Sequence, residues 1–197
     1  LCSGQLLPPL ADHGQTEVAY ATLLSTGSPS WLGMLEHGAT TAWEWWDAIG
    51  DDGSVRGSLN HYSKAAVVSF LYTHVAGIRL DAVPDAATAA FRRVRIAPIP
   101  GGGLSWARAS LDTARGPIRS GWHIYEGVLT LDVELPDGTD ASISLPDGTT
   151  REVGVFGRNG LAPAEQLVAD RAVGRIRPLQ DARGDRDQQM LLDLRAL

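Results

Sequence analysis

The sequence predicts a two-part α+β chain, in which helices come first and an antiparallel β-sandwich follows. Three observations predict this class. In the first third of the chain, apolar residues recur with the i, i+4 spacing of one helix face. After the segment DAVPDAA (residues 81–87) the apolar period changes to two, as in strands with one solvated face. Turn-forming stretches rich in glycine, proline, serine and aspartate separate the segments.

The helical part begins with a predicted hairpin. Its second helix lies between residues 15 and 25, and Gly14 suits the turn that separates it from a shorter helix before it. The apolar face of the second helix comprises Ala19, Tyr20, Leu23 and Leu24. A turn at residues 26–30 (TGSPS) ends the hairpin.

A second helical segment is expected at residues 62–76 (YSKAAVVSFLYTHVA), which are apolar almost all round. This pattern is typical of a helix buried on most sides, and Gly77 is its natural end. Because a few isolated helices do not make a domain, we expect them to belong to a larger all-helical body whose other members lie outside this chain.

The second part alternates with period two. In LTLDVEL (residues 129–135) the leucines and the valine point inward, while Thr130, Asp132 and Glu134 point outward. A PDG turn leads to DASISL (residues 140–145), with Ala141, Ile143 and Leu145 inward. Further strands are expected in RRVRIAPI (92–99), LSWARASL (104–111) and IRSGWHI (118–124), the last followed by a YEG turn. About five or six antiparallel strands between residues 91 and 153 suffice for a small sandwich.

These patterns predict three regions: helices at residues 1–80, a β-sandwich at 85–155, and a tail at 156–197 that we assign to neither. The boundary between the first two should lie near residues 78–90. The tail has weak helical periodicity interrupted by a polar, turn-rich stretch.

Composition limits the partners of the chain. Its 17 Lys and Arg against 23 Asp and Glu give a formal net charge of -6. The sequence has no basic stripe, which argues against a nucleic-acid partner. The sequence contains no run of about 18 apolar residues, so no membrane partner is predicted. Cys2 is the only cysteine, so no disulfide framework is expected and a cytoplasmic location is slightly favoured. A secretion signal could still precede Leu1, because LCSGQLLPPL is typical of the interior of a longer chain.

The motifs of cofactor and metal sites are missing from the sequence. No pair of the five histidines has the i, i+4 spacing of a zinc site with a glutamate base. The glycine-rich PGGGLSW (residues 100–106) is followed by neither a lysine nor a helix start, which argues against a phosphate loop. We therefore expect no cofactor and no metal.

The stretch EHGATTAWEWWD (residues 36–47) places Glu44 among Trp43, Trp45 and Trp46. One interpretation is that the tryptophans form a core and Glu44 points to water. The other is a carbohydrate site, since sugar rings lie on aromatic faces while their hydroxyls and the scissile bond need carboxylates. Both interpretations remain open on this stretch alone.

A second candidate is NHY (residues 60–62), at the start of the buried helix. Asn60 could cap that helix while His61 faces the cavity enclosed by the loops. Alternatively, His61 merely satisfies a backbone carbonyl. Together with Glu44, His61 favours a functional site.

Three segments resemble consecutive parts of the bacterial alpha-L-rhamnosidases of glycoside hydrolase family 78. They are PSWLGMLEHGATTAWEWWD, SLNHYSKAAVVSFLYTHVAGI and IAPIPGGGLSWARASLDTARGPIRSGW, and the resemblance spans roughly residues 4–153. It implies a C-terminal fragment that carries the last helices of an (α/α)6 barrel and then an antiparallel β-sandwich. It also implies an inverting hydrolase that releases terminal alpha-L-rhamnose from glycosides or polysaccharides.

Residue by residue, Glu44 matches the general base of the family and His61 matches a histidine that contacts rhamnose, although the loop before His61 is a few residues shorter than usual. Trp43 is the third expected site residue, as a substrate contact beside Glu44. The general acid of the family lies in earlier helices, so we expect this chain to need the missing N-terminal portion of the same enzyme and to be inactive alone. The alternatives are a non-catalytic carbohydrate-binding or structural module, and another inverting glycosidase on the same barrel.

Overall fold

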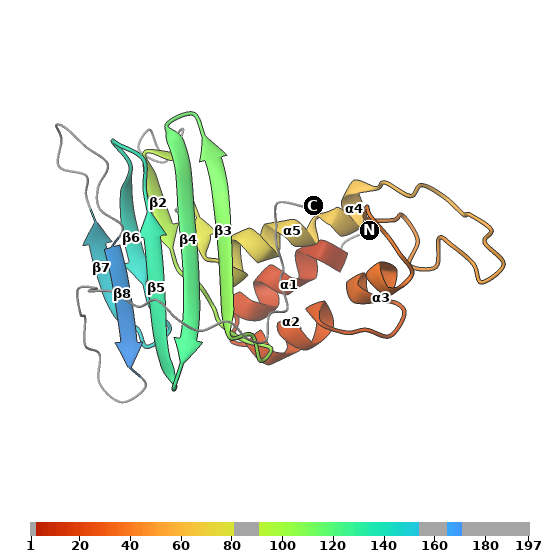
Figure 1. Ribbon diagram of the computed structural model, residues 1–197, viewed down its shortest axis with the longest axis horizontal. Coiled ribbons are helices and arrows are strands. Elements are labelled where there is room, and N and C mark those ends of the chain that lie inside the picture. The colour runs from red at the N-terminus through yellow and green to blue at the C-terminus, as the bar shows by residue number, and fades with distance from the viewer. Residues whose placement is uncertain (1–2, 81–90, 154–164, 171–197) are drawn as a thin grey trace. The chain divides into compact units, whose positions relative to one another are not determined.

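The computed structural model describes residues 3–80, 91–153 and 165–170 (Figure 1). These residues form two compact units, the first comprising the residues up to Leu71 together with Gly101–Gly103, and the second containing the other described residues. The first unit is helical and the second is built mainly from strands. The predicted combination of helices with β-sheets is therefore confirmed.

The helical unit contains the predicted hairpin, formed by α1 (Ser3–Asp12) and α2 (Thr16–Leu23), with Gly14 at a φ of 77° in the turn. Three further helices follow in this unit: α3 (Trp31–Glu36), α4 (Tyr62–Ala65) and α5 (Val67–Phe70). The helix expected at residues 62–76 is thus divided after Ala65, and its last turn, η1 (Leu71–Val75), is π-helical. Gly77 follows with a φ of 86°, as its predicted role at the helix end requires.

The core of the helical unit lies where α1 contacts α2 and α5. Tyr20 and Phe70 are fully buried, and their rings meet edge to face with centroids 5.9 Å apart. Burial raises the pKa of Tyr20. A Cβ on Gly4 would lie 2.5 Å from the backbone nitrogen of Val67, so only glycine allows α1 to approach α5 this closely.

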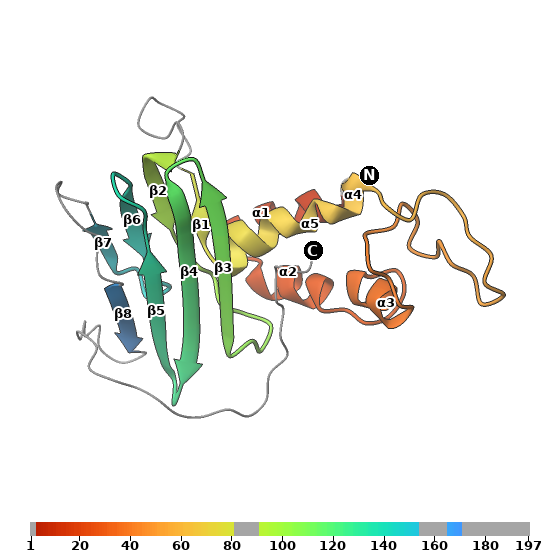
Figure 2. The same cartoon turned by 45° about the horizontal axis from the view of Figure 1, so that its top comes forward.

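The second unit is a β-sandwich of two four-stranded sheets, which Figures 1 and 2 show as two layers. The first sheet has the order β1-β2-β6-β7, and the second has the order β3-β4-β5-β8. The strands are β1 (Ile78–Arg79), β2 (Arg93–Ile96), β3 (Trp106–Thr113), β4 (Gly116–Tyr125), β5 (Val128–Glu134), β6 (Asp140–Ser144), β7 (Thr150–Val153) and β8 (Glu165–Asp170).

One strand pair departs from the predicted antiparallel arrangement. β2 and β6 are parallel, in a register that runs from Arg93 opposite Asp140 to Ile96 opposite Ile143. After β2 the chain builds β3, β4 and β5 in the other sheet, and β6 then returns beside β2 in the same direction. Alternation predicts which face of a strand is buried, but it carries no information about strand direction.

The predicted core of the sandwich is confirmed. All seven residues expected inward on β5, β6 and the segments after them are buried, namely Leu129, Leu131, Val133, Leu135, Ala141, Ile143 and Leu145. Thr130 was expected on a wet face and is buried. The outward face of β5 is therefore only partly solvated, since Asp132 on the same face is exposed.

β8 falls within the tail for which weak helical periodicity was noted. Residues 165–170 form a strand because they pair with β5 along its length, from Val128 opposite Asp170 to Val133 opposite Glu165. Pairing with an existing sheet overrides such weak local preference. The rest of the predicted tail, like the DAVPDAA segment, lies outside the described residues.

Candidate active site

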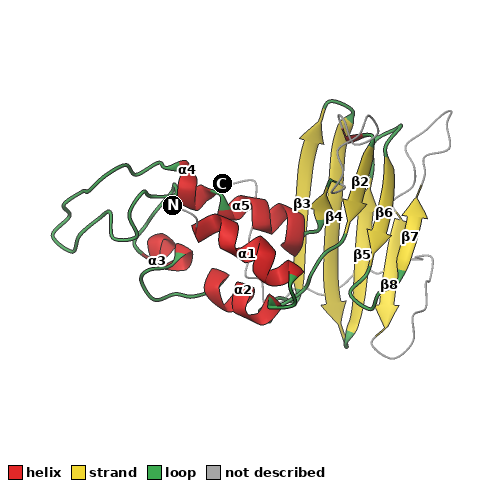
Figure 3. Ribbon diagram, turned by 180° about the vertical axis from the view of Figure 1, so that it is seen from behind, coloured by secondary structure: helices red, strands yellow, loops and turns green. Residues whose placement is uncertain are grey.

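The candidate site lies on the long loop between α3 and α4, which Figure 3 shows projecting from the helices. We call residues 39–61 the Glu44 loop. Its outgoing and returning legs are joined by backbone hydrogen bonds: Glu44 N–H donates to Ser58, Arg56 N–H to Ala48 and His61 N–H to Ala42, each over 2.8 Å. The segment AIGDDGSVRG is therefore the tip of a hairpin-like loop, and it returns the chain toward its start.

This joining of the legs brings the two predicted polar site residues together. The returning residue His61 is bonded to Ala42, two positions before Glu44, and Glu44 itself is bonded to Ser58, three positions before His61. Glu44 and His61 therefore lie near each other on facing legs.

The three tryptophans have different environments. Trp43 is only 3% exposed and contacts a small core with Met34 and Ala48. Trp45 is 47% exposed, and the Arg56 guanidinium lies 4.6 Å from its ring centroid. The packing interpretation of the WEWW stretch thus holds for Trp43 but not for Trp45, and the carbohydrate site stays a prediction.

Trp46 is the third member and is partly buried. Its ring meets Trp31 of α3 edge to face, with centroids 5.3 Å apart. Its face receives the Lys64 ammonium at 4.8 Å from the centroid. Trp46 therefore joins the loop to both α3 and α4.

Glu44 is half-buried, and its carboxylate is held from the returning leg. The backbone N–H of Ser58 donates to Oε2 over 3.0 Å. Gly57 lies directly against the same carboxylate: a Cβ there would be 2.9 Å from Oε2 and 2.5 Å from Cδ1 of Trp45, and its φ is 69°. Only glycine permits this approach, both in space and in backbone conformation.

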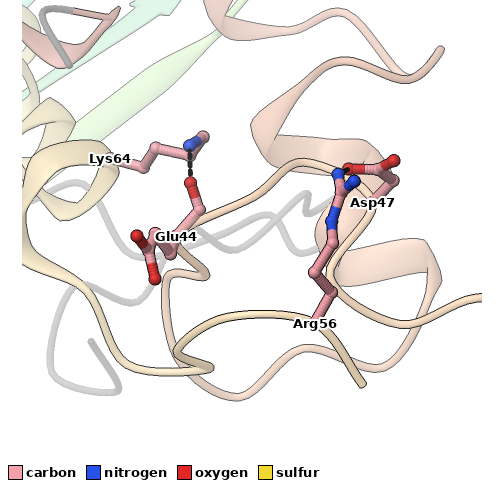
Figure 4. A network of polar contacts seen from close by, with 4 residues as sticks. All are labelled: Glu44, Asp47, Arg56 and Lys64. Atoms are coloured by element: carbon pink, nitrogen blue, oxygen red, sulfur yellow. Dashed lines mark hydrogen bonds and ion pairs between the residues drawn. The ribbon is translucent and has the colours of Figure 1, made fainter. Parts of the chain in front are cut away.

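The main chain of Glu44 is held from the opposite direction. The Lys64 ammonium donates to the Glu44 carbonyl oxygen, and Figure 4 shows the carboxylate pointing away from that contact. Figure 4 also shows the Arg56–Asp47 ion pair, which lies 2.6 Å apart on the exposed side of the loop. Glu44 is thus fixed at its backbone and at one carboxylate oxygen.

His61, rather than Asn60, is the N-cap of α4, which corrects the predicted cap. Its Nδ1 accepts a hydrogen bond from the Ser63 N–H over 3.3 Å and lies 2.8 Å from the Ser63 hydroxyl. An imidazole nitrogen can cap a helix when its ring turns back over the first turn, as an Asn or Asp side chain does. Since a backbone N–H can only donate, Nδ1 is the acceptor, and the proton of the neutral ring lies on Nε2.

Three contributors to the site were missed by sequence reasoning: Gly57, Ser58 and Lys64. The glycine of SVRGS and the single lysine inside an apolar helix were visible signals, but neither identifies its partner. Both partners are main-chain or carboxylate atoms of Glu44, many positions away along the chain.

Within the described ranges, no group of three or more His, Cys, Asp or Glu residues is arranged to hold a metal ion. In the same ranges, none of the helices has the length and apolar character needed to cross a membrane.

Comparison with known proteins matches both parts of the chain to domains of the bacterial alpha-L-rhamnosidases. Residues 2–75 match the model of the bacterial alpha-L-rhamnosidase 6 hairpin glycosidase domain, and residues 77–158 match that of the bacterial alpha-L-rhamnosidase C-terminal domain. An alpha-L-rhamnosidase of Streptomyces avermitilis is 37% identical over 146 residues, which is 72% of this chain and 14% of the relative.

Solved structures agree. The alpha-L-rhamnosidase of Streptomyces avermitilis complexed with L-rhamnose matches with a TM-score of 0.69 and 33% identity, over 78% of this chain and 16% of that one. The native alpha-L-rhamnosidase of Aspergillus terreus matches with a TM-score of 0.74 and 29% identity, over 87% of this chain and 19% of that one. The chain thus spans less than a fifth of the length of these proteins.

Proposed function

Because the chain belongs to the bacterial alpha-L-rhamnosidase family, we propose that it is part of an inverting hydrolase that releases terminal alpha-L-rhamnose from glycosides or polysaccharides. In this proposal the helices are the last members of an (α/α)6 barrel. The observation that carries the proposal is the position of Glu44, a half-buried carboxylate held by the Ser58 N–H on a loop rich in tryptophan.

Glu44 has the role of general base. Inversion requires two carboxyl groups about 6.5 to 9.5 Å apart, with a water between the base and the sugar carbon. The Ser58 N–H holds one oxygen of Glu44, which leaves the second oxygen to accept a proton from that water. The general acid comes from another part of the enzyme, so this chain carries one half of the catalytic pair and does not hydrolyse rhamnosides by itself.

His61 binds the sugar. With Nδ1 occupied by Ser63, the ring presents Nε2–H, which can donate to a rhamnose hydroxyl. Trp43 was expected to contact the substrate as well. Since its side chain lies in the Met34 core, its contribution in this chain is to support the leg that carries Glu44.

The test is Glu44→Gln in the full-length enzyme that contains this chain, assayed with an aryl alpha-L-rhamnoside. Gln keeps the shape and can still accept from Ser58, but it cannot take a proton from water. We expect kcat to fall by at least about 10²-fold while KM changes little. Glu36→Gln, which removes an exposed carboxylate at the end of α3, is the matched control and should leave kcat unchanged.

Azide makes this test specific for the base. It attacks the anomeric carbon without losing a proton, so added azide should partly restore the rate of Glu44→Gln and give a glycosyl azide of inverted configuration. A near-normal kcat in Glu44→Gln would exclude Glu44 as the base. Hydrolysis by the chain alone would show that the second carboxyl group lies within it.

A further inference from the structure

Lys64 is a buried cation in an unusual position. Lys64 is 9% exposed and lies in the short helix α4, at the start of the largely apolar segment 62–76. Within the described residues, no carboxylate lies within ion-pair distance of its ammonium, which instead contacts the Glu44 carbonyl oxygen and the face of Trp46. A buried ammonium without a paired anion costs stability, so packing alone gives no reason for a lysine here.

The surroundings of Lys64 form a closed set of contacts. The indole N–H of Trp31 donates to the Lys64 carbonyl over 3.0 Å, Trp31 meets Trp46 edge to face, and Trp46 covers the Lys64 ammonium. Tryptophans therefore contact Lys64 both at its backbone carbonyl and at its ammonium, which also binds Glu44. Because these contacts hold Lys64 in place, its ammonium can hold the outgoing leg of the Glu44 loop at the Glu44 carbonyl.

We propose that Lys64 is a positioning residue for Glu44, which holds the main chain at residue 44 so that the carboxylate, fixed by Ser58 on its other side, stays aligned with the attacking water. This inference rests on the proposed base function of Glu44. Lys64 does not touch the reacting atoms, because its contact is with the backbone carbonyl and the carboxylate points away from it (Figure 4).

The electrostatics agree with this geometry. Burial lowers the pKa of Lys64, and the negative charge of Glu44 acts in the opposite direction and raises it. The charge of Glu44 is thus close enough to favour the protonated lysine, although the two groups form no direct ion pair among the described contacts.

The experiment compares Lys64→Met with Arg56→Met in the full-length enzyme. Methionine keeps the apolar stem of lysine and removes the ammonium. Arg56 is the matched control, since it is also a cation over a tryptophan of the same loop but is exposed and paired with Asp47. We expect Lys64→Met to lower kcat by about 10-fold or more with KM little changed, because misplacement of about 1 Å can cost up to 10²-fold. Arg56→Met should keep kcat.

Two readouts separate positioning from a merely structural role. First, the Tm of Lys64→Met should be unchanged or higher, since a buried unpaired charge has been replaced by an apolar side chain. Second, azide should stimulate Lys64→Met, because azide attack does not need an aligned base. The azide forms a C–N bond at the anomeric carbon as the glycosidic C–O bond breaks, and the leaving oxygen takes its proton from the general acid.

A parent-like kcat in Lys64→Met would overturn the inference, as would a loss of kcat that azide does not relieve. If Lys64→Met does not yield folded protein, Lys64→Gln is measured in the same way and judged by the same outcomes. Glu44→Gln is run alongside: if it loses activity while Lys64→Met does not, the positioning role fails and the base role stands. If Glu44→Gln keeps its activity, the base role itself fails.

Discussion

The β-sandwich is held together by apolar side chains that alternate along each strand, whereas the Glu44 loop is held by backbone hydrogen bonds, indole rings and the ammonium of Lys64. The sandwich core joins residues of both sheets, including Val94, Leu131 and Ile143. The loop has only a small core beneath Trp43, and its legs are joined by hydrogen bonds. The stability of the sandwich therefore depends on the apolar area that it buries, whereas the structure of the Glu44 loop depends on a few hydrogen bonds and ring contacts.

The largest expected effect is on the sandwich. Leu131 is fully buried in its core, so Leu131→Ala should lower the free energy of unfolding by about 2 to 5 kcal/mol. Ile124→Ala, on the neighbouring strand but 37% exposed, should change it by no more than about 0.5 kcal/mol. Chemical denaturation of both variants measures the difference. Similar costs for the two would mean that burial does not decide the stability of this sheet.

In the loop, the corresponding change is Gly57→Ala. The new methyl group would collide with Trp45 and with the carboxylate of Glu44, so we expect kcat of the full-length enzyme to fall by about 10 to 10²-fold. Gly53→Ala is the matched control, because its φ of 77° imposes the same backbone strain but open space surrounds its Cβ. If both variants lose the same activity, backbone strain, and not the approach to Glu44, is the cause.

A smaller effect is expected at His61, which both caps α4 and is proposed to bind rhamnose. His61→Ala should weaken binding by about 0.5 to 1.5 kcal/mol, the worth of one hydrogen bond. His61→Asn separates the two roles, since asparagine can cap the helix through Ser63 but does not place a donor where Nε2 lies. A binding constant of His61→Asn equal to that of the parent would remove His61 from the sugar site.

The smallest expected effect is a dependence of stability on alkaline pH. Because burial lowers the pKa of Lys64, the folded protein releases this proton at a lower pH than the unfolded chain, whose lysine has a pKa of about 10.4. Between these two pKa values the unfolded chain binds more protons, so folding becomes more favourable as pH rises. The Tm of the parent relative to Lys64→Met should therefore increase as the pH rises from the lowered pKa of the folded state toward the pKa of the unfolded chain. A constant difference in Tm would contradict the lowered pKa.

The same contrast explains what could be predicted from sequence. Leu129, Leu131 and Val133 were placed correctly because alternation along a strand is a local pattern, and each side chain can point to only one of two faces. The hairpin turn after β4 was also predicted, from the glycine of YEG between two alternating segments, and Glu126 and Gly127 both have positive φ there. The family was correctly identified because the segments around Glu44 and His61 are distinctive.

What could not be predicted depends on contacts between distant residues. Nothing in WEWW distinguishes the buried Trp43 from the exposed Trp45, because their environments arise from the hydrogen bonds between the two legs. The cap at His61 was missed because the usual preference favours Asn60. The partner of Lys64 is invisible in sequence because it is a carbonyl oxygen, a group that every residue possesses.

The parallel pairing of β2 with β6 has a consequence for the order in which the sandwich assembles. β3, β4 and β5 are joined by short turns and can zip together locally, with little loss of chain entropy. β2 pairs with β6, which follows β3, β4 and β5 in the chain. Contacts between residues so far apart in the sequence form slowly, because a long loop must be closed first. We therefore expect the three-stranded meander to form the folding nucleus and the β2–β6 ladder to form late. Until that ladder closes, the inner face of the meander, with Leu131 at its centre, is exposed and open to association with other chains.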